Sequence, residues 1–330
     1  MFLFFRLAAA VAAALSFVIA PLPAHADKIG DGGKIRIMAS PYGTQSFIPF
    51  VIKKYRLDEK YGFELERISF ADSKASSAAL QTGGAELAIL DWTGLALMRN
   101  AGIDVIGVAP FLTYVSVIVV PTDSPIAGIP DLKGKKFGIF SRTSSDWILV
   151  DAAARKKHGL DLAREAELQE GAPTLLRGAL EQGQLDATIM FSSISPDMIA
   201  SGKYKGIFTI RDVTEDLGLP LAPYLMIATT ERYAKDKPQN VRAFVAAYKE
   251  IVDILMTDQS VWDEQGANMK LSGEALAVYR DQIRRDLLKS FAPETSDTLR
   301  KTFEILVETA GAEALGMQAM PETILTLDFQ

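Results

Sequence analysis

Two kinds of hydrophobic pattern alternate along the chain from about residue 27 to residue 120. In the run Lys34–Met38, Ile35 and Ile37 alternate with basic residues, which is typical of a strand with one buried face. Further strands are predicted over Glu64–Ile68, Leu87–Leu90 and Val105–Val108, and helices over Gln45–Leu57, Ser73–Gln81 and Gly94–Asn100. Strands and helices that alternate in this way predict a parallel sheet covered by helices.

A second unit of the same kind is predicted from about residue 120, after the β-branched run Tyr114–Val120. Its expected elements are the strand Lys136–Phe140, the helix Ser144–His158 closed by Gly159, the helix Pro173–Gln182, the strand Asp186–Phe191 and a loop over Asp212–Pro220. The run Leu221–Ala228 then returns the chain to the first unit, and mainly helical sequence follows from Pro238, including Ser272–Lys289 and Ser296–Ala310. This pattern predicts a discontinuous lobe 1 (27–119 and 222–330) and an inserted lobe 2 (120–221).

An internal similarity connects the two predicted lobes. The sequences "ALQTGGAELAIL" (Ala79–Leu90) and "ALEQGQLDATIM" (Ala179–Met190) share Ala-Leu, a glycine, an acidic residue and an isoleucine, each 100 positions apart. Both predict a helix that ends at glycine and leads through an acidic turn into a strand. Such units are common in α/β proteins, and duplication of one half would produce the same pattern. Under either explanation, the two lobes are expected to be built alike.

The first 26 residues have the pattern of a secretory signal peptide. Arg6 precedes an apolar run over Leu7–Ala20, and the small-residue sequence Ala24-His25-Ala26 follows. The run is shorter than the roughly 20 residues that a membrane-spanning helix needs. We therefore expect cleavage before Asp27 and a mature protein in the periplasm.

Composition excludes several function classes. The 330 residues contain no cysteine, and beyond residue 26 the one histidine is His158, at a predicted helix end. No Ser–His pairing, phosphate-binding glycine loop or His/Cys metal spacing is present, so no enzyme, cofactor or metal site is expected. The formal net charge of −6, without basic runs, argues against nucleic acid and anionic membranes as partners.

Five segments in a fixed order resemble a known protein family. They are "LQTGGAELAI", "DLKGKKFGI" before a Ser/Thr-rich turn, "LDATIMFSSISP", "YLMIATTERYAKDKPQNVRAFVAAY" and the loop Ser40–Thr44 after the first strand. In these segments the chain is similar to the nitrate/taurine/sulfonate and thiamine-precursor family of ABC importer substrate-binding proteins. "DLKGKKFGI" and "ERYAKDKPQNVRAF" are the most specific of them, and the resemblance covers nearly the whole chain beyond residue 26.

The resemblance implies a type II periplasmic-binding-protein fold, with two Rossmann-like α/β lobes, two crossing strands and a ligand cleft between the lobes. It also implies capture of a small organic molecule for a membrane permease and its ATPase, with the protein acting as a monomer. An exported ligand-binding module for a sensor or scaffold is the alternative. One segment departs from the family, because Phe191–Pro196 has hydroxyl side chains where many relatives have a Trp-Glu-Pro type sequence. A ligand that needs that glutamate is therefore not expected.

Loops at the carboxyl ends of the strands are the expected ligand contacts, because open α/β sheets bind ligands there. The candidates in lobe 1 and beside the crossings are Tyr42, Gly43, Thr44, Asp91, Trp92, Thr93, Tyr114 and Tyr224. Those in lobe 2 are Arg142, Thr143, Ser144, Ser145, Trp147, Phe191 and Ser192.

Two ligand chemistries remain open. The turn from Arg142 to Ser145 combines a cation, hydroxyls and the first N–H groups of a helix, which suits an organic anion such as a sulfonate or aromatic carboxylate. Thr143 or Ser144 capping the helix explains the same residues without a ligand. The aromatic candidates form a set that suits a flat, pyrimidine-like ring. For either ligand, we expect the two lobes to close over it by a hinge motion.

Overall fold

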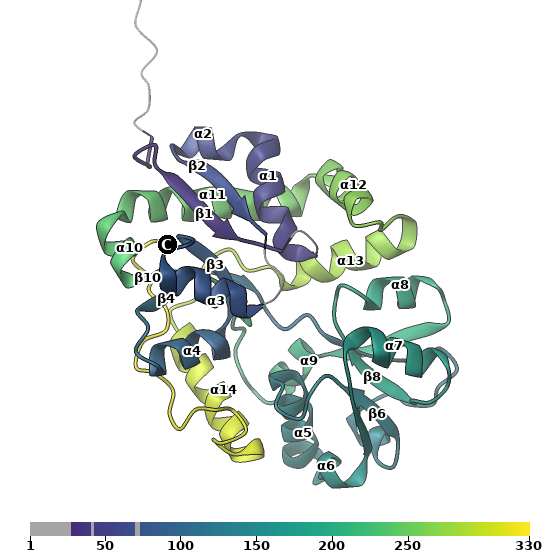
Figure 1. Ribbon diagram of the computed structural model, residues 1–330. Helices are drawn as coiled ribbons and strands as arrows, with labels where there is room; N and C mark the ends of the chain where they lie inside the picture. Colours follow the sequence, from purple (N-terminus) through teal and green to yellow (C-terminus); the bar gives the residue numbers. More distant parts are fainter. Residues whose placement is uncertain (1–27, 41–42, 70–72) are drawn as a thin grey trace, which may run out of the picture.

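The computed structural model describes residues 28–40, 43–69 and 73–330 (Figure 1). The predicted signal peptide and Tyr42 lie outside the described residues. Two five-stranded sheets, one in each lobe, form the framework. Sheet A has the order β2-β1-β3-β10-β4, and sheet B has the order β7-β6-β8-β5-β9.

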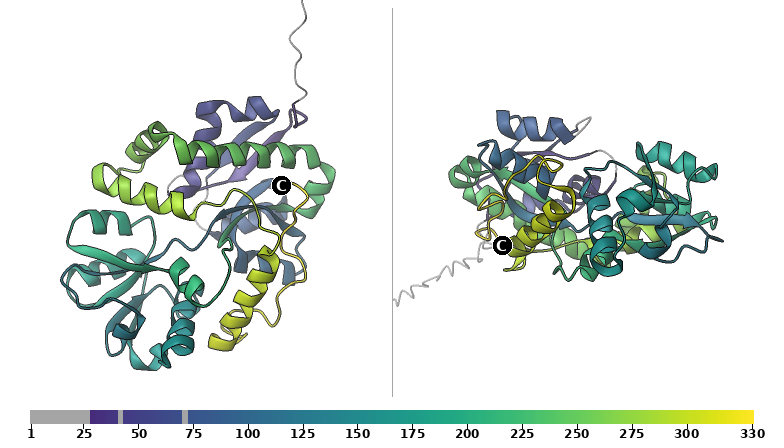
Figure 2. Two further views of the ribbon diagram at one scale, coloured as in Figure 1. Left: turned by 180° about the vertical axis from the view of Figure 1, so that it is seen from behind. Right: turned by 90° about the horizontal axis from the view of Figure 1, so that it is seen from below.

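The strands of sheet A are β1 (Lys34–Met38), β2 (Glu64–Ile68), β3 (Leu87–Asp91), β4 (Val105–Leu112) and β10 (Leu225–Thr230). Its helices are α1 (Phe47–Tyr55), α2 (Leu57–Tyr61), α3 (Ser73–Thr82), α4 (Trp92–Asn100), α10 (Glu231–Asp236), α11 (Pro238–Thr257), α12 (Gln259–Asn268) and α13 (Gly273–Asp286). Seen from behind, α11 runs across the whole of this lobe (Figure 2).

The strands of sheet B are β5 (Val117–Pro121), β6 (Lys136–Ile139), β7 (Glu167–Glu170), β8 (Ala187–Met190) and β9 (Tyr204–Thr209). Its helices are α5 (Ser145–His158), α6 (Leu162–Glu165), α7 (Pro173–Glu181), α8 (Ser195–Ala200) and α9 (Ile210–Asp216). Short 3-10 turns lie at η1 (Thr44–Ser46) and η2 (Ile129–Leu132), and α14 (Thr295–Ala310) packs against α5.

Alternation along the strands decides which side chains enter which core, because successive residues of a strand point to opposite faces. In β3, Leu87 and Ile89 join the cluster beneath α1 and α11, whereas Ala88 and Leu90 join the cluster on the other face. Both faces of the sheet are therefore buried, which is why β3 is apolar from Leu87 to Leu90.

The prediction of parallel sheets is wrong for one strand in each. β10 is antiparallel to β3 and β4, and β5 is antiparallel to β8 and β9. Both reversed strands come directly after a segment that crosses between the lobes, so they enter their sheets from the side where the other strands end. β5 starts at Val117 and β10 at Leu225, while the lobe boundaries at 119/120 and 221/222 stay a prediction.

The internal similarity of the sequence has a structural counterpart. Its two copies form α3–β3 and α7–β8, which hold the same place in the order of their sheets. The N–H of Arg36 donates to Glu86 Oε2 at 2.7 Å, and that of Lys136 donates to Asp186 Oδ2 at 2.8 Å, again 100 positions on. The same bonding at the same spacing is what duplication of one half predicts.

The predicted bounds of most other elements agree with the structure, and one predicted loop does not. β1 and β2 have the predicted bounds, and α5 ends at Gly159, whose φ is 65°. The predicted loop over 212–220 is wrong in its first part, because α9 extends to Asp216. Thr209 caps α9 by accepting a hydrogen bond from the N–H of Asp212, and this capping box was a signal in the sequence.

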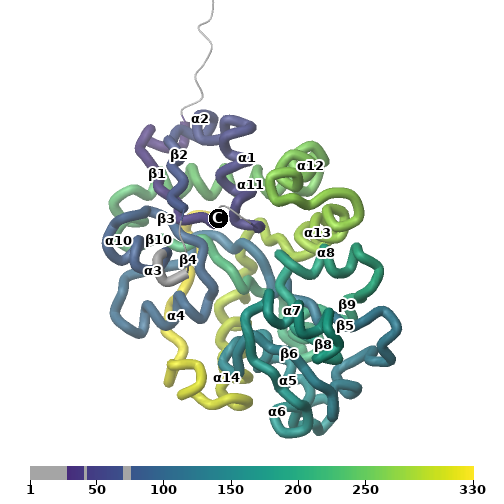
Figure 3. The backbone as a smooth tube through the Cα atoms, turned by 45° about the vertical axis from the view of Figure 1, so that its right-hand side comes forward, coloured from purple at the N-terminus to yellow at the C-terminus, as the bar shows by residue number. Residues whose placement is uncertain are grey.

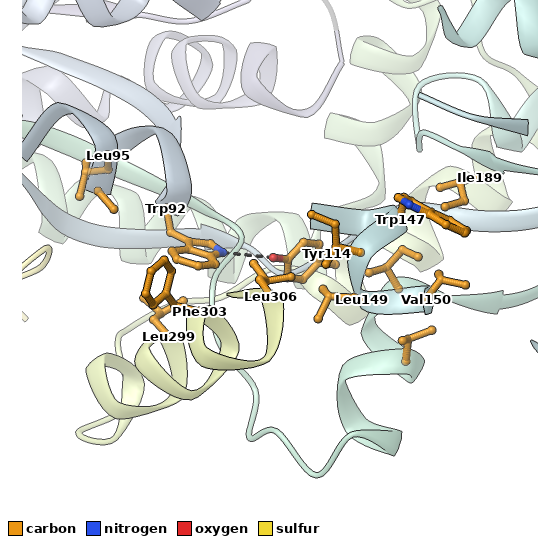
Figure 4. Packing of buried hydrophobic residues seen from close by; sticks show 14 of the residues in the cluster. Trp92, Leu95, Tyr114, Trp147, Leu149, Val150, Ile189, Leu299, Phe303 and Leu306 are labelled. Atoms are coloured by element: carbon orange, nitrogen blue, oxygen red, sulfur yellow. Dashed lines mark hydrogen bonds between the residues drawn. The ribbon is translucent and has the colours of Figure 1, made fainter. Parts of the chain in front are cut away.

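The lobes contact each other on two sides. α13 of lobe 1 contacts α8 of lobe 2, and α14 contacts α5, as Figures 1 and 3 show. A single buried cluster extends from Trp92 and Phe303 through Tyr114 to Trp147 in lobe 2 (Figure 4). The lobes are therefore joined by packing as well as by chain crossings.

The segment 324–326 lies along β4, which is the edge strand of sheet A. The N–H of Gly107 donates to Ile324 O, and the N–H of Thr326 donates to Gly107 O, both at 2.9 Å. The side chain of Gln330 also donates to Val108 O at 2.8 Å. This segment occupies hydrogen-bonding groups that the edge of a sheet otherwise leaves free. No helix in the described part of the chain has the length and apolar character to cross a membrane.

The turn at Gly183, between α7 and β8, requires the backbone conformation of glycine, and this requirement can be tested by substitution. Gly183 has a φ of 69°, a conformation unfavourable for other residues, whereas Gly178 lies within α7. Neither has an atom within 4 Å of an added Cβ. We expect Gly183→Ala to lower the free energy of unfolding by about 1 kcal/mol and Gly178→Ala to raise it by up to about 1 kcal/mol. Urea denaturation of the two variants measures the difference, and equal effects would contradict it.

Candidate functional site

Asp91 closes β3 and begins α4, at the carboxyl end of a lobe 1 strand. Its Oδ1 accepts a hydrogen bond from the N–H of Gly94 at 2.7 Å and another from the Thr93 hydroxyl. The aspartate is thus the N-cap of α4, and both it and Thr93 stay partly exposed. A capping role and a ligand-facing position are compatible here.

Asp146 lies in the first turn of α5, across the lobe junction from Asp91. Its Oδ2 accepts a hydrogen bond from Ser116 Oγ at 2.6 Å, and its Oδ1 has no hydrogen-bond partner within the described part of the chain. The side chain is buried, with 7% of the residue exposed. Burial, together with the nearby charge of Asp91, raises the pKa of Asp146 to about 6.

The two crossing segments contribute a pair of tyrosines. The rings of Tyr114 and Tyr224 stack with centroids 4.6 Å apart and planes at 24°. Trp92 Nε1 donates to the Tyr114 hydroxyl at 3.1 Å (Figure 4), and Ser145 also contacts that hydroxyl. Burial raises the pKa of both tyrosines. Tyr114 is buried, whereas Tyr224, counted over backbone and side chain together, is partly exposed.

Both predicted tryptophans belong to the core in this conformation. Trp92 is fully buried and packs in one cluster with Leu299, Phe303 and Leu306 (Figure 4). Trp147 is buried against Phe137, with ring centroids 6.0 Å apart. Neither ring is therefore available as a ligand wall here, and Trp92 contributes to the site through its hydrogen bond to Tyr114.

The turn before α5 is arranged differently from the anion site that its composition suggests. Arg142 pairs with Glu170, with 3.2 Å between Nε and Oε1, and its N–H donates to the same carboxylate at 2.9 Å. Ser144 is the N-cap of α5 without a side-chain cap, because its hydroxyl donates to Ser141 O at 2.8 Å. Thr143 is exposed. The one cation of this turn is therefore already paired with a carboxylate.

The remaining candidates lie in two other loops. Phe191 is partly exposed beside Phe140, with ring centroids 5.8 Å apart, and Ser192 is buried. In lobe 1, Gly43 and Thr44 begin η1, and Thr44 contacts the buried hydroxyl of Tyr279. The structure thus joins Asp91, Tyr114, Tyr224 and Ser145 in one cluster, whereas Arg142 and Thr143 of the turn before α5 are exposed and form no hydrogen bond with it in the part of the chain that the structure describes.

Sequence reasoning missed two polar residues of this cluster, Asp146 and Ser116. Asp146 follows Ser145 directly, so the candidate turn contained it, but nothing local indicates that its carboxylate is buried. Ser116 stands within a β-branched run that reads as a strand. A polar residue inside such a run was the available signal.

The buried carboxylate of Asp146 predicts how stability depends on pH. Its pKa of about 6 in the folded protein exceeds the unfolded value near 3.9, so the folded state loses stability as pH rises from 4 to 7, by roughly 3 kcal/mol. Asp146→Asn removes this charge and can still accept the Ser116 bond. We expect the variant to unfold at a higher temperature than the parent at pH 7.5 and at a similar temperature at pH 4. Calorimetry at both pH values measures this, and a variant less stable at pH 7.5 would refute it.

Comparison with known proteins identifies the fold and the family of the chain. The aliphatic sulphonate binding protein SsuA of Escherichia coli superposes with a TM-score of 0.70, at 20% identity over 89% of this chain and 93% of that one. The alkanesulfonate-binding SsuA of Xanthomonas axonopodis pv. citri, bound to MOPS, superposes with a TM-score of 0.66, at 18% identity over 89% of this chain and 98% of that one.

A putative sulfonate-binding SsuA from Methylobacillus flagellatus KT gives a TM-score of 0.67 at 18% identity over 90% of this chain and 92% of that one. At such identities the likeness shows the fold, which is that of periplasmic binding proteins, as the resemblance implied. No curated protein matches in sequence. The family model described as NMT1/THI5 like matches residues 59–260. The chain therefore belongs to the NMT1/THI5-like family.

Proposed function

We propose that the protein is the solute-binding component of an ABC importer and captures a small organic molecule between its two lobes. The observation that carries the proposal is the meeting of Asp91 from lobe 1, Asp146 from lobe 2 and the stacked tyrosines of both crossings at one point. Polar groups and an aromatic surface that come from both lobes are what a ligand needs in order to hold the lobes together.

The names of the superposed proteins support this role. Two are named as sulfonate-binding proteins, one of them periplasmic, and a third is named as a putative periplasmic component of a sulfonate ABC transporter. By extension, the partners of this chain are a membrane permease and its ATPase, its location after signal-peptide cleavage is the periplasm, and it works as a monomer. In keeping with the names of the superposed proteins, which are all binding proteins, it binds its solute without chemical turnover.

The mechanism that we propose is rotation of lobe 2 against lobe 1 about the two crossings. The crossings are anchored at their ends, because the N–H of Tyr224 donates to Leu112 O at 2.8 Å and the N–H of Thr113 donates to Asp286 O at 3.0 Å. Ser116 and Asp146 lie next to these anchors, so opening displaces the lobe 2 side of the cluster from the lobe 1 side. The closed form is then the state that the permease recognises.

Solution scattering with a thermal-shift screen tests capture and closure. A solute held by both lobes raises the apparent stability by mass action, by about 2.7 kcal/mol at 100 times its dissociation constant. We expect any solute that gives such a shift also to reduce the radius of gyration. A bound solute that leaves the radius unchanged would contradict closure.

The importer role has a separate test. Deleting the gene should abolish uptake of the bound solute by the cell, and restoring the full chain should recover it. Uptake that survives the deletion would contradict the transport role and leave a sensor or scaffold as the use of the binding site.

A further inference from the structure

We infer that the solute presents a protonated or N–H-donating nitrogen to Asp146 and is not a sulfonate or carboxylate held by that part of the site. The inference rests on the proposed function and assigns the chemical class of the ligand. It concerns the cluster of Asp91, Asp146, Tyr114 and Tyr224, together with Ser116, which is called the junction cluster below.

The first observation is an unmet hydrogen-bonding demand. Ser116 satisfies Asp146 Oδ2, but Oδ1 has no partner among the described residues, although the residue is only 7% exposed. A buried carboxylate oxygen without a donor is costly, and a site that exists to bind a donor can supply the missing partner. An ammonium, amidinium or ring N–H is such a donor.

The second observation is the sign of the charge at the junction cluster. Asp91 and Asp146 are close enough for the charge of one to raise the pKa of the other carboxyl. Within residues 28–40, 43–69 and 73–330, neither aspartate forms an ion pair with Lys, Arg or His, whereas Arg142 is paired with Glu170. An anionic solute placed here would face two carboxylates and no free cation, while a cationic solute would neutralise them.

The third observation concerns the start of α5, which would otherwise favour an anion. The partial positive charge at a helix N-terminus attracts negative groups. In α5 that demand is already met by Asp146 itself, which is the acidic residue of the first turn. The helix start therefore stabilises the carboxylate of the site and leaves the ligand to supply the positive charge.

The tyrosine pair adds a shape to this chemistry. The ring of Tyr224 stacks on that of Tyr114, with 4.6 Å between the centroids, and the charges of both aspartates contribute to the raised pKa of both tyrosines. An aromatic face beside a carboxylate suits a flat cation, which gains from the ring electrons as well as from the charge. A planar amidine or amino-substituted ring fits these groups best.

Two flat cations and two flat anions test the inference on the intact protein. Benzamidine and 4-aminopyridine are compared with benzenesulfonate and benzoate by thermal shift at pH 7.5, followed by calorimetry. We expect one or both cations to bind and neither anion to do so. Asp146→Asn should weaken cation binding by about 10- to 100-fold, the value of a charge-assisted hydrogen bond. Asp123→Asn removes a charge from an exposed turn and should leave the affinity unchanged.

A second measurement separates a binding role from a structural one. Lowering the pH from 7.5 to 5 protonates Asp146, whose pKa is about 6. This should weaken the binding of cations to the parent protein. The residual cation binding of the Asp146→Asn variant should hardly change. The groups that face Asp146 are Asp91, Ser116, Tyr114 and Tyr224. The two tyrosines do not titrate between pH 5 and 7.5, because burial raises their pKa.

The outcomes are distinct. Binding of benzenesulfonate or benzoate with no cation binding overturns the inference and leaves solute capture intact. Binding of none of the four overturns the inference, while solute capture is tested separately by the thermal-shift screen and solution scattering. Cation binding that Asp146→Asn does not weaken overturns the assignment of Asp146 as the recognition residue.

Discussion

The chain has to pass between its lobes twice, and most of the architecture follows from that constraint. Each passage delivers a strand that enters its sheet from the end where the other strands finish, which makes β5 and β10 antiparallel. The strand ends, the helix starts and the two passages are thereby forced into one region. Residues far apart in sequence, such as Asp91, Ser116 and Tyr224, become neighbours of the same aspartate there.

The junction cluster also shows how a binding protein can hold a polar group in an unfavourable environment. Asp146 would be easier to accommodate as an apolar residue, because its burial opposes ionisation. Nearby, Trp92 and Tyr114 are buried, and the indole N–H of Trp92 holds the hydroxyl of Tyr114 in place. A rigid apolar surrounding with few polar groups orders the site when the protein folds. The entropic cost of ordering these side chains is then not incurred when the ligand binds.

Sequence predicts the elements whose signals are local. Alternating residues define β1, and a glycine able to adopt a positive φ ends α5 at its predicted place. β7 was missed because Glu167–Glu170 is a polar edge strand without alternation, and it is recognisable only from its pairing with β6. Of the candidate cluster, the sequence offered Asp91 and Ser145 at strand ends and Tyr114 and Tyr224 beside the crossings, and the binding role of all four stays a prediction. The buried state of Asp146 depends on Ser116, 30 residues away, and on packing that no local pattern encodes.

The segment 324–326 that lies along β4 has a practical consequence for how the protein behaves at high concentration. An unprotected edge strand is a template onto which another chain can add, and β4 is eight residues long and buried throughout its length. By pairing with Gly107, the segment prevents another chain from adding to this part of the sheet edge. Anything that displaces this segment, such as a tightly attached fusion partner, would expose the edge of β4 and favour aggregation.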